Sequence, residues 1–357
     1  MVSVIVPARN EEACLGRCLE SLAAQTGVSF EIIVVDDGST DRTREIAQSF
    51  PGVRLLEPGP LPPCWSGKNN ALVAGAGEAR GEWLLFTDAD TVHRAESLAR
   101  AVAEAQQQKA ALLSYSPEQE VRGFWEKAVM PVIFAELAST YRPTEVSDPR
   151  SDAAAANGQY ILVSREAYDA AGGHAAVGAS LLEDVALARA VKASGRRIFF
   201  RYGGDAVRTR MYRSFAQLRE GWTKNLALLF PSPLLLALLR LAEFGLIIAS
   251  AAMAVSMGLL GRTQAAAGIG ILAIVFSSLF LARVRKAHFS WDASGLALIG
   301  LPLFSYLLLC SRIAYAQRTI SWKGRHYAGN CNLSLKDGVR VEPPHDAGAT
   351  SSHATSH

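Results

Sequence analysis

Cysteine and charge are both scarce in this 357-residue chain, and each shortage excludes a class of protein. Five cysteines are too few for a scaffold held by disulfides, and none of their spacings fits a zinc site. Only 19% of the residues are charged while 50% are hydrophobic, so the chain as a whole is not disordered. The net charge is +3 and no nucleic-acid-binding motif is present, so we expect no nucleic-acid partner.

The first residues lack two further patterns. A dinucleotide-binding oxidoreductase needs Gly-x-Gly-x-x-Gly after its first strand, but residues 7–10 read Pro-Ala-Arg-Asn. No basic stretch precedes the first apolar run, so the pattern of a signal peptide is missing. We therefore expect the first domain to stay in the cytosol.

Long apolar runs are present in the C-terminal part. Each holds about 18–23 residues with few charges, which is enough to cross the ~30 Å hydrocarbon core of a membrane. The preceding stretch contains Pro231, Pro233 and Arg240, which favour an interfacial or re-entrant segment over a span. The three long runs lie at 243–260, 264–282 and 294–316.

The sequence thus predicts a membrane protein of the plasma (inner) membrane, multi-pass, with its first domain in the cytosol. The positive-inside rule favours a cytosolic loop at 283–286, but three spans would then place the basic segment after them outside, so the side of the tail stays open. The expected parts are a globular domain 1–225, an interfacial or re-entrant segment 226–242, about three transmembrane helices in 243–316, a basic segment 317–342 and a disordered tail 343–357.

Strand and helix patterns alternate through the first domain. The runs FEIIVV at 30–35 and WLLF at 83–86 are almost continuously apolar, as in parallel strands buried on both faces. Helices are expected after them, at 40–50 and 95–107. This alternation predicts an α/β fold with a mostly parallel sheet and flanking helices, followed by the transmembrane region. Such sheets bind ligands beyond the carboxyl ends of their strands.

Acidic residues gather at those strand ends. Each one alone is compatible with a helix cap or a favourable helix-dipole contact. Three clusters at one edge of a sheet repel one another unless a cation or a hydrogen-bonding ligand is present. An Asp-x-Asp pair offers the hard oxygen ligands that suit Mg²⁺ or Mn²⁺. The clusters are Asp36 with Asp37, Asp88 with Asp90, and Glu183 with Asp184.

Four motifs, in this order along the chain, resemble those of the inverting family 2 glycosyltransferases of the GT-A fold, over about residues 1–225. They are VSVIVPARNEE (2–12), EIIVVDDGSTDRT (31–43), TDADT (87–91) and LLEDVALA (181–188). Further similarity lies in CWSGKN (64–69), NG (157–158), GGH (172–174) and SWKGR (321–325). Together with the apolar runs, these motifs resemble the membrane-bound branch that glycosylates lipids, such as ceramide glucosyltransferases and carotenoid- or hopanoid-associated glycosyltransferases.

The resemblance implies a site for a nucleotide-sugar donor. Asp37 would accept a hydrogen bond from the base, which favours uracil and hence a UDP-sugar. Asp88 would face the ribose or the metal, and Asp90 would hold Mg²⁺ or Mn²⁺ on the diphosphate, where the ion neutralises charge on the departing UDP. Lys68 would pair with the diphosphate or hold the acidic loops. The other residues expected around the nucleotide are Pro7, Ala8, Arg9, Glu11 and Asp36.

The resemblance also implies a catalytic base and an acceptor pocket. Asp184 would take the proton from the acceptor hydroxyl as its oxygen attacks the anomeric carbon, so that a single displacement inverts the configuration. Asn157, Gly158 and Glu183 would shape the donor and acceptor pockets. Trp222 would stack on the acceptor near the membrane surface.

One motif of the membrane-bound branch is incomplete, because Gly221 stands where that branch has an arginine. Arg219 or Lys224 would supply the charge instead. The sequence as a whole favours a metal-dependent, inverting transferase that moves a sugar from a UDP-sugar to a lipid-like acceptor. Two alternatives stay open: a polysaccharide- or polyprenyl-phosphate-directed glycosyltransferase, and an inactive nucleotide-sugar-binding membrane scaffold. The intact acidic clusters speak against the scaffold.

Overall fold

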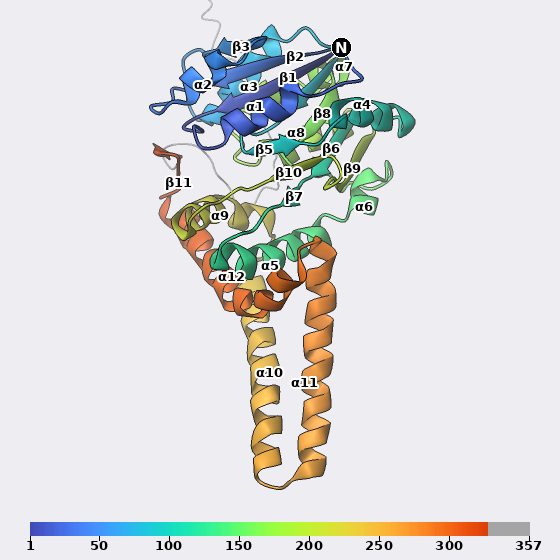
Figure 1. Cartoon of the computed structure of the whole chain (residues 1–357), viewed down its shortest axis with the longest axis vertical. Helices are drawn as coiled ribbons and strands as arrows, with labels where there is room; N and C mark the ends of the chain where they lie inside the picture. Colours follow the sequence, from blue (N-terminus) through green and yellow to red (C-terminus); the bar gives the residue numbers. More distant parts are fainter. Residues whose placement is uncertain (328–357) are drawn as a thin grey trace, which may run out of the picture.

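The computed structural model describes residues 1–327. The tail expected at 343–357, and the part of the basic segment beyond residue 327, lie outside the described residues. Within the described part, a seven-stranded sheet is covered by helices and lies next to a layer of helices. A long helical hairpin projects from that layer (Figure 1).

The main sheet is mostly parallel, as the sequence predicts. β1 pairs in parallel with β2 and β4, β2 with β3, and β6 with β9, whereas β8 runs antiparallel to β4 and β6. In order across the sheet, the strands are β3 (Val53–Leu56), β2 (Phe30–Asp36), β1 (Val2–Ala8), β4 (Trp83–Phe86), β8 (Ile161–Ser164), β6 (Leu112–Ser116) and β9 (Ile198–Tyr202). A smaller sheet contains β5 (Thr91–His93), β10 (Val207–Thr209) and β7 (Glu118–Gln119).

Side chains of β1 alternate between two hydrophobic clusters, as the two-residue period of a strand requires. Val4 and Val6 belong to the cluster with α1 and α4, and Ile5 belongs to the cluster with α3 and α8. Because both faces are covered, the strand ends are where polar side chains can meet a ligand. The helices of this domain are α1 (Leu15–Ala23), α2 (Thr43–Ser49), α3 (Gly67–Glu78), α4 (Ser97–Gln107), α6 (Pro143–Ser147), α7 (Arg165–Ala170) and α8 (Glu183–Ala193), with a short 3₁₀ turn at Gly173–Ala175.

Three helices form the layer beneath the sheets: α5 (Phe124–Thr140), α9 (Phe215–Leu229) and α12 (Trp291–Gln317) (Figure 1). α12 packs closely on α5, because a Cβ at Gly300 would lie 1.9 Å from the carbonyl oxygen of Ala128. At its other end, the Tyr315 hydroxyl donates to the Lys224 carbonyl of α9 at 2.7 Å. α12 therefore connects α5 to α9 and is part of the folded layer.

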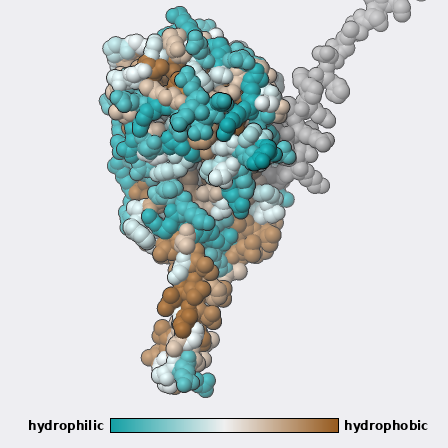
Figure 2. Space-filling model, turned by 90° about the vertical axis from the view of Figure 1, so that its right-hand side faces the viewer, coloured by the Kyte–Doolittle hydropathy of each residue, from teal (hydrophilic) through white to brown (hydrophobic). Residues whose placement is uncertain are grey.

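The projecting hairpin consists of α10 (Pro233–Leu259) and α11 (Thr263–Val284), and a 3₁₀ turn at Arg285–Ala287 follows it. Within the described part, α10, α11 with that turn, and α12 are long and apolar enough to cross a membrane. The first two are only 11% buried over their most apolar stretches, whereas α12 is 50% buried. The apolar surface of the hairpin is exposed (Figure 2).

The structure differs from the segment expected at 226–242. Residues 226–229 end α9, and α10 already begins at Pro233 and continues to Leu259 without a break. Proline suits the first turn of a helix, since its missing N–H has no partner there. Arg240 is accommodated because it pairs with Glu136 of α5 at 3.2 Å and with Glu243 at 2.6 Å.

Candidate active site

Lys68 joins two of the three acidic clusters. It lies in the first turn of α3, which Ser66 caps by accepting a hydrogen bond from the Asn69 N–H at 3.0 Å. Its Nζ lies 2.7 Å from Asp88 Oδ1 and 2.8 Å from Glu183 Oε1. Burial opposes the charge on Glu183, but Lys68, together with Lys224, lowers the pKa of this carboxyl to about 2. Asp88 and Glu183 are thus held together as a compensated ionic cluster.

Asp184 lies next to this cluster at the start of α8. Its Oδ2 accepts a hydrogen bond from the Gly158 N–H at 2.9 Å, and its Oδ1 accepts one from the Val185 N–H at 2.8 Å. Burial and the neighbouring Glu183 carboxylate raise the pKa of Asp184 to about 6. A pKa near the working pH suits a group that accepts a proton during a reaction.

Gly158 permits this close approach of backbone and side chain. A Cβ at that position would lie 3.1 Å from Lys68 Nζ and 3.5 Å from Asp184 Oδ2. The predicted pocket residue Asn157 has a local role, since its Oδ1 accepts a hydrogen bond from the Gln159 N–H at 3.0 Å and shapes the turn into β8. Glycine and asparagine at these positions thus fix the loop that faces the acids.

The remaining acidic cluster, Asp36 with Asp37, contains two residues with different surroundings. Asp36 accepts a hydrogen bond from the Ser39 N–H at 3.2 Å, so it shapes the turn after β2. The Asp37 carboxylate instead pairs with Arg325, whose Nη2 lies 3.0 Å from Asp37 Oδ1. Sequence reasoning could not separate the two adjacent aspartates, because both follow the same buried strand.

Pro7, Ala8 and Arg9 position this loop. Pro7 and Ala8 pair with the last residues of β2, and the Asp37 N–H donates to the Ala8 carbonyl at 2.8 Å. Arg9 donates to the backbone carbonyl of Asp37, so it holds the main chain and leaves the carboxylate to another partner. These three residues therefore hold the backbone of the loop that carries Asp37.

The C-terminal hairpin contributes two cations that sequence reasoning had given no role. It consists of β11 (Ser321–Trp322) and β12 (Arg325–His326) and follows α12. Lys323 pairs with Glu11, and its Nζ also donates to the Arg9 carbonyl at 3.0 Å. Arg325 pairs with Asp37 at the first turn of α3. The SWKGR motif was recognised by resemblance, but its contacts lie about 300 residues away in sequence and leave no local signal.

Asp90 has the properties of a cation ligand. Its Oδ1 is buried and has no hydrogen-bond partner among residues 1–327. Burial and the neighbouring carboxylates of Asp88 and Glu11 raise the pKa of Asp90 to about 7. No group of three or more histidine, cysteine, aspartate or glutamate side chains in the described part forms a ready-made metal site. The donor set nevertheless fits a divalent ion, since a buried carboxylate oxygen without a partner gains most from a cation.

Trp222 does not lie where an acceptor could stack on it. It is 3% exposed, and its indole N–H points to the Met130 sulfur of α5 at 3.4 Å. The expectation of an acceptor contact is therefore corrected: Trp222 fills the interface between α5 and α9. A side chain at Gly221 would collide with the Tyr212 ring, with its Cβ 2.5 Å from the hydroxyl oxygen, which explains why an arginine is absent there.

Lys224 is better placed than Arg219 to supply the missing charge. Both line a cavity of about 350 Å³ between α9 and α12. Lys224, which is one turn of α9 beyond Gly221, interacts electrostatically with Glu183 and Asp184 and lies 5.5 Å from the Trp322 ring centre. Burial lowers the pKa of Lys224. The Arg219 side chain has no hydrogen bond or ion pair within residues 1–327.

The structure contains a mostly parallel sheet with acidic clusters at its carboxyl edge, and a lysine joins two of these clusters. This is the arrangement expected for a glycosyltransferase of the GT-A type. A family model, Glycosyl transferase family 2, matches residues 3–170. The protein is a glycosyltransferase, and residues 3–170 are similar to family 2.

The relatives are glycosyltransferases as well. A 4,4'-diaponeurosporenoate glycosyltransferase of Staphylococcus aureus is 28% identical over 342 residues, covering 92% of this chain and 88% of the relative. A mannosyltransferase from Pyrobaculum calidifontis in complex with GDP-Man and Mn²⁺ is 18% identical with a TM-score of 0.49, covering 88% of this chain and 86% of that one. A glucosyl-3-phosphoglycerate synthase from Mycobacterium tuberculosis, in complex with Mn²⁺, UDP and phosphoglyceric acid, is 22% identical with a TM-score of 0.42, covering 63% and 77%.

Proposed function

We propose that the protein transfers a sugar, with inversion, from a UDP-sugar to a lipid-like acceptor at the membrane surface, and that it depends on Mg²⁺ or Mn²⁺. The observation that carries this proposal is the position of Lys68 between Asp88 and Glu183, beside Asp184. This lysine brings the Asp-x-Asp motif and the candidate base together at one edge of the sheet. The S. aureus relative, which is named for diaponeurosporenoate, supports an acceptor of that kind.

Each residue has a defined part in the proposed reaction. Asp37 binds the base of the nucleotide, and Asp90 with Asp88 would hold the ion. The ion, when bound, supplies positive charge to the leaving diphosphate. Asp184 takes the proton of the acceptor hydroxyl at Oδ1 or Oδ2 as the acceptor oxygen attacks the anomeric carbon from the face opposite UDP.

The raised pKa of Asp184 predicts how activity depends on pH. A base works only when it is deprotonated, so kcat/KM should rise with pH through about 6 and level off above it. A carboxyl at its ordinary value of about 3.9 would give no decline between pH 7 and 5. Initial rates between pH 5 and 8, at saturating metal, measure the acidic limb. A flat profile over this range would contradict the assignment of Asp184 as the base.

We also propose a membrane topology with two spans. α10 has 27 residues and α11 has 22, so at ~1.5 Å per residue both can cross a ~30 Å core. The C-terminal hairpin contacts Glu11 and Asp37, so it lies on the same side of the membrane as the first domain. Three spans would separate them, whereas the α10–α11 hairpin with α12 along the surface keeps both on the cytosolic side, where the basic residues are favoured.

A screen of radiolabelled UDP-sugars with the host's total lipid extract tests the proposed function. We expect label in a lipid fraction in the presence of Mg²⁺ or Mn²⁺ and loss of that label with EDTA. Label in a polymer would favour the polysaccharide-directed alternative. UDP binding without any transfer would favour the inactive scaffold, and transfer that persists in EDTA would exclude the metal requirement.

A further inference from the structure

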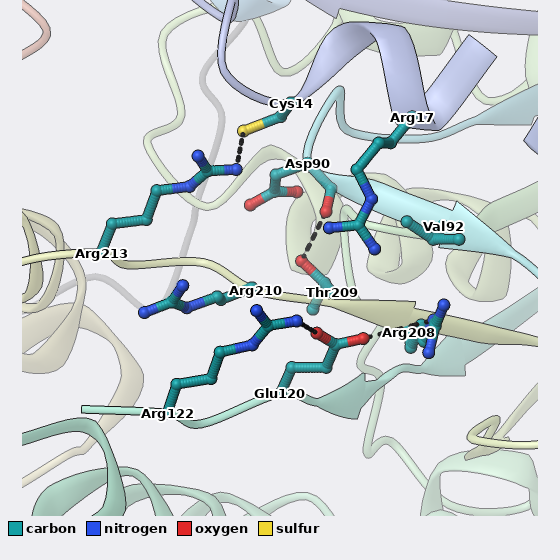
Figure 3. A pocket seen from close by; sticks show the side chains of 10 residues that line it. All are labelled: Cys14, Arg17, Asp90, Val92, Glu120, Arg122, Arg208, Thr209, Arg210 and Arg213. Carbon is teal, nitrogen blue, oxygen red and sulfur yellow. Dashed lines mark hydrogen bonds and ion pairs between the residues drawn. The ribbon is translucent and has the colours of Figure 1, made fainter. Parts of the chain in front are cut away.

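A pocket rich in arginine lies beside Asp90. It has a volume of about 120 Å³ and opens between the start of α1, the edge of the small sheet and the segments that lead into α5 and α9 (Figure 3). Of the residues proposed to act on the donor, only Asp90 lines it, and Lys68, Asp88, Glu183 and Asp184 do not. The arginines that line it are Arg17, Arg122, Arg208, Arg210 and Arg213.

The arginines that line the pocket outnumber the carboxylates that line it, so positive charge is in excess there. Five guanidinium groups face two carboxylates, those of Asp90 and Glu120. Glu120 is shared between Arg122 at 3.2 Å and Arg208 at 3.3 Å. The Arg17 side chain makes no hydrogen bond or ion pair with any residue in 1–327. Like charges gathered in this way favour the binding of an anion.

The contacts of Arg213 and Arg210 also indicate an anion site. Arg213 Nη2 donates to neutral atoms, the Ala13 carbonyl at 2.9 Å and the Cys14 sulfur at 3.4 Å, so its charge is not paired (Figure 3). Arg210 pairs with Glu126 at 3.1 Å, but its Nε is buried without an acceptor among the described residues. A buried donor without a partner is costly, and an anion oxygen would satisfy it.

An aromatic surface adjoins the pocket on the side of the helical layer. Phe124 and Trp125 start α5 just after Arg122, and they are 47% and 46% exposed. The ring of Trp125 lies 5.1 Å from that of Phe124 and 5.0 Å from that of Phe215, which starts α9 just after Arg213. Exposed aromatic rings at a membrane surface favour contact with apolar chains.

We propose that this pocket binds an acid group of the acceptor, a carboxylate or a phosphate, while the apolar chain of the acceptor lies over Phe124, Trp125 and Phe215. The arginines hold the acid group by charge-assisted hydrogen bonds, and the aromatic surface selects an amphiphile over a small anion. This inference rests on the proposed function, because it names the chemical class of the acceptor. It places only the acid group of that acceptor beside Asp90, and the hydroxyl that reacts is a different group of the same molecule.

The test uses the full-length protein in nanodiscs and four radiolabelled probes: hexadecanoate, hexadecyl phosphate, hexadecanol and inorganic phosphate. The wild type should bind hexadecanoate and hexadecyl phosphate. It should bind hexadecanol and inorganic phosphate much more weakly. The double variant Arg17→Gln/Arg213→Gln should bind the acidic amphiphiles about tenfold more weakly or worse. A second variant, Arg17→Lys/Arg213→Lys, should recover part of that binding because it keeps the charge.

Matched controls separate this inference from the proposed function. Arg42→Gln/Arg150→Gln removes two exposed arginines elsewhere and should leave amphiphile binding unchanged. UDP binding in the same nanodiscs reports on the donor site and on folding, and it should persist in every variant. A protein that binds UDP but loses no amphiphile affinity in Arg17→Gln/Arg213→Gln would overturn the pocket while leaving the proposed function intact.

Three further outcomes also overturn the inference. Equal affinity for inorganic phosphate and hexadecyl phosphate would make the pocket a site for small anions. Equal affinity for hexadecanol would remove the role of the acid group. Competition between UDP and hexadecanoate would mean that the arginines bind the nucleotide-sugar donor. Wild-type protein that neither binds UDP nor transfers sugar would instead refute the proposed function, whatever the amphiphiles do.

Discussion

Replacing Asp184 with asparagine is expected to lower kcat by about a hundred- to ten-thousandfold while UDP still binds, since this is the usual contribution of a general base. Asparagine keeps the shape of the side chain, and its oxygen can still accept the Gly158 N–H that holds Asp184 Oδ2 at 2.9 Å. It cannot take a proton from the acceptor. The loss should therefore fall on turnover, and the KM for the donor should change little.

The measurement is single-turnover transfer from the UDP-sugar, with UDP affinity determined on the same preparation. Asp169→Asn is a matched control, because Asp169 is an exposed aspartate on α7 that belongs to none of the acidic clusters. It should leave both quantities unchanged. Turnover in Asp184→Asn above a tenth of the wild-type rate would exclude Asp184 as the base, and equal losses of turnover and UDP binding would make it a structural residue.

Replacing Lys68 with methionine is expected to weaken donor binding and to destabilise the fold. The change leaves the Asp88 and Glu183 carboxylates close together without their shared cation. Removing one partner of a fully buried ion pair costs about 3–5 kcal/mol. Solvent reaches this one, since 31% of the Lys68 side chain and 28% of the Asp88 side chain are exposed. We expect the free energy of unfolding to fall by about 2 kcal/mol.

A double variant shows whether the ionic cluster is the cause. In Lys68→Met/Glu183→Gln one of the two uncompensated carboxylates is gone, so the protein should recover part of the stability lost in Lys68→Met. Chemical denaturation in one detergent, for the wild type, both single variants and the double variant, completes the cycle. Additive losses would mean that Lys68 and Glu183 act independently, which the 2.8 Å contact between them does not permit.

The sheet and its acidic edge were predictable because they depend on short stretches of sequence. FEIIVV and WLLF are strands β2 and β4 in the structure, and the acids that follow them lie at the carboxyl edge. The different surroundings of Asp36 and Asp37 were not predictable, since they depend on Ser39 and on the distant Arg325.

Errors arose where packing between helices decides the outcome. Trp222 was expected at the acceptor because of its motif, but the indole fills the contact of α9 with α5. The stretch at 226–242 was expected to lie at the membrane surface because it contains prolines and an arginine. Pro233 is used as a helix start, and Glu136 on another helix neutralises Arg240. Neither contact can be predicted from the residues next to it in the sequence.

The hairpin after α12 gives the long apolar helices a second role. Glu11 and Asp37 lie in the first 40 residues, yet their cationic partners, Lys323 and Arg325, arrive only after the chain has passed through the last apolar helix. A fragment that ends at residue 225 would keep every acidic cluster and still lack the cationic partners of Glu11 and Asp37. The apolar helices are thus also the covalent tether that returns these two cations to the first domain.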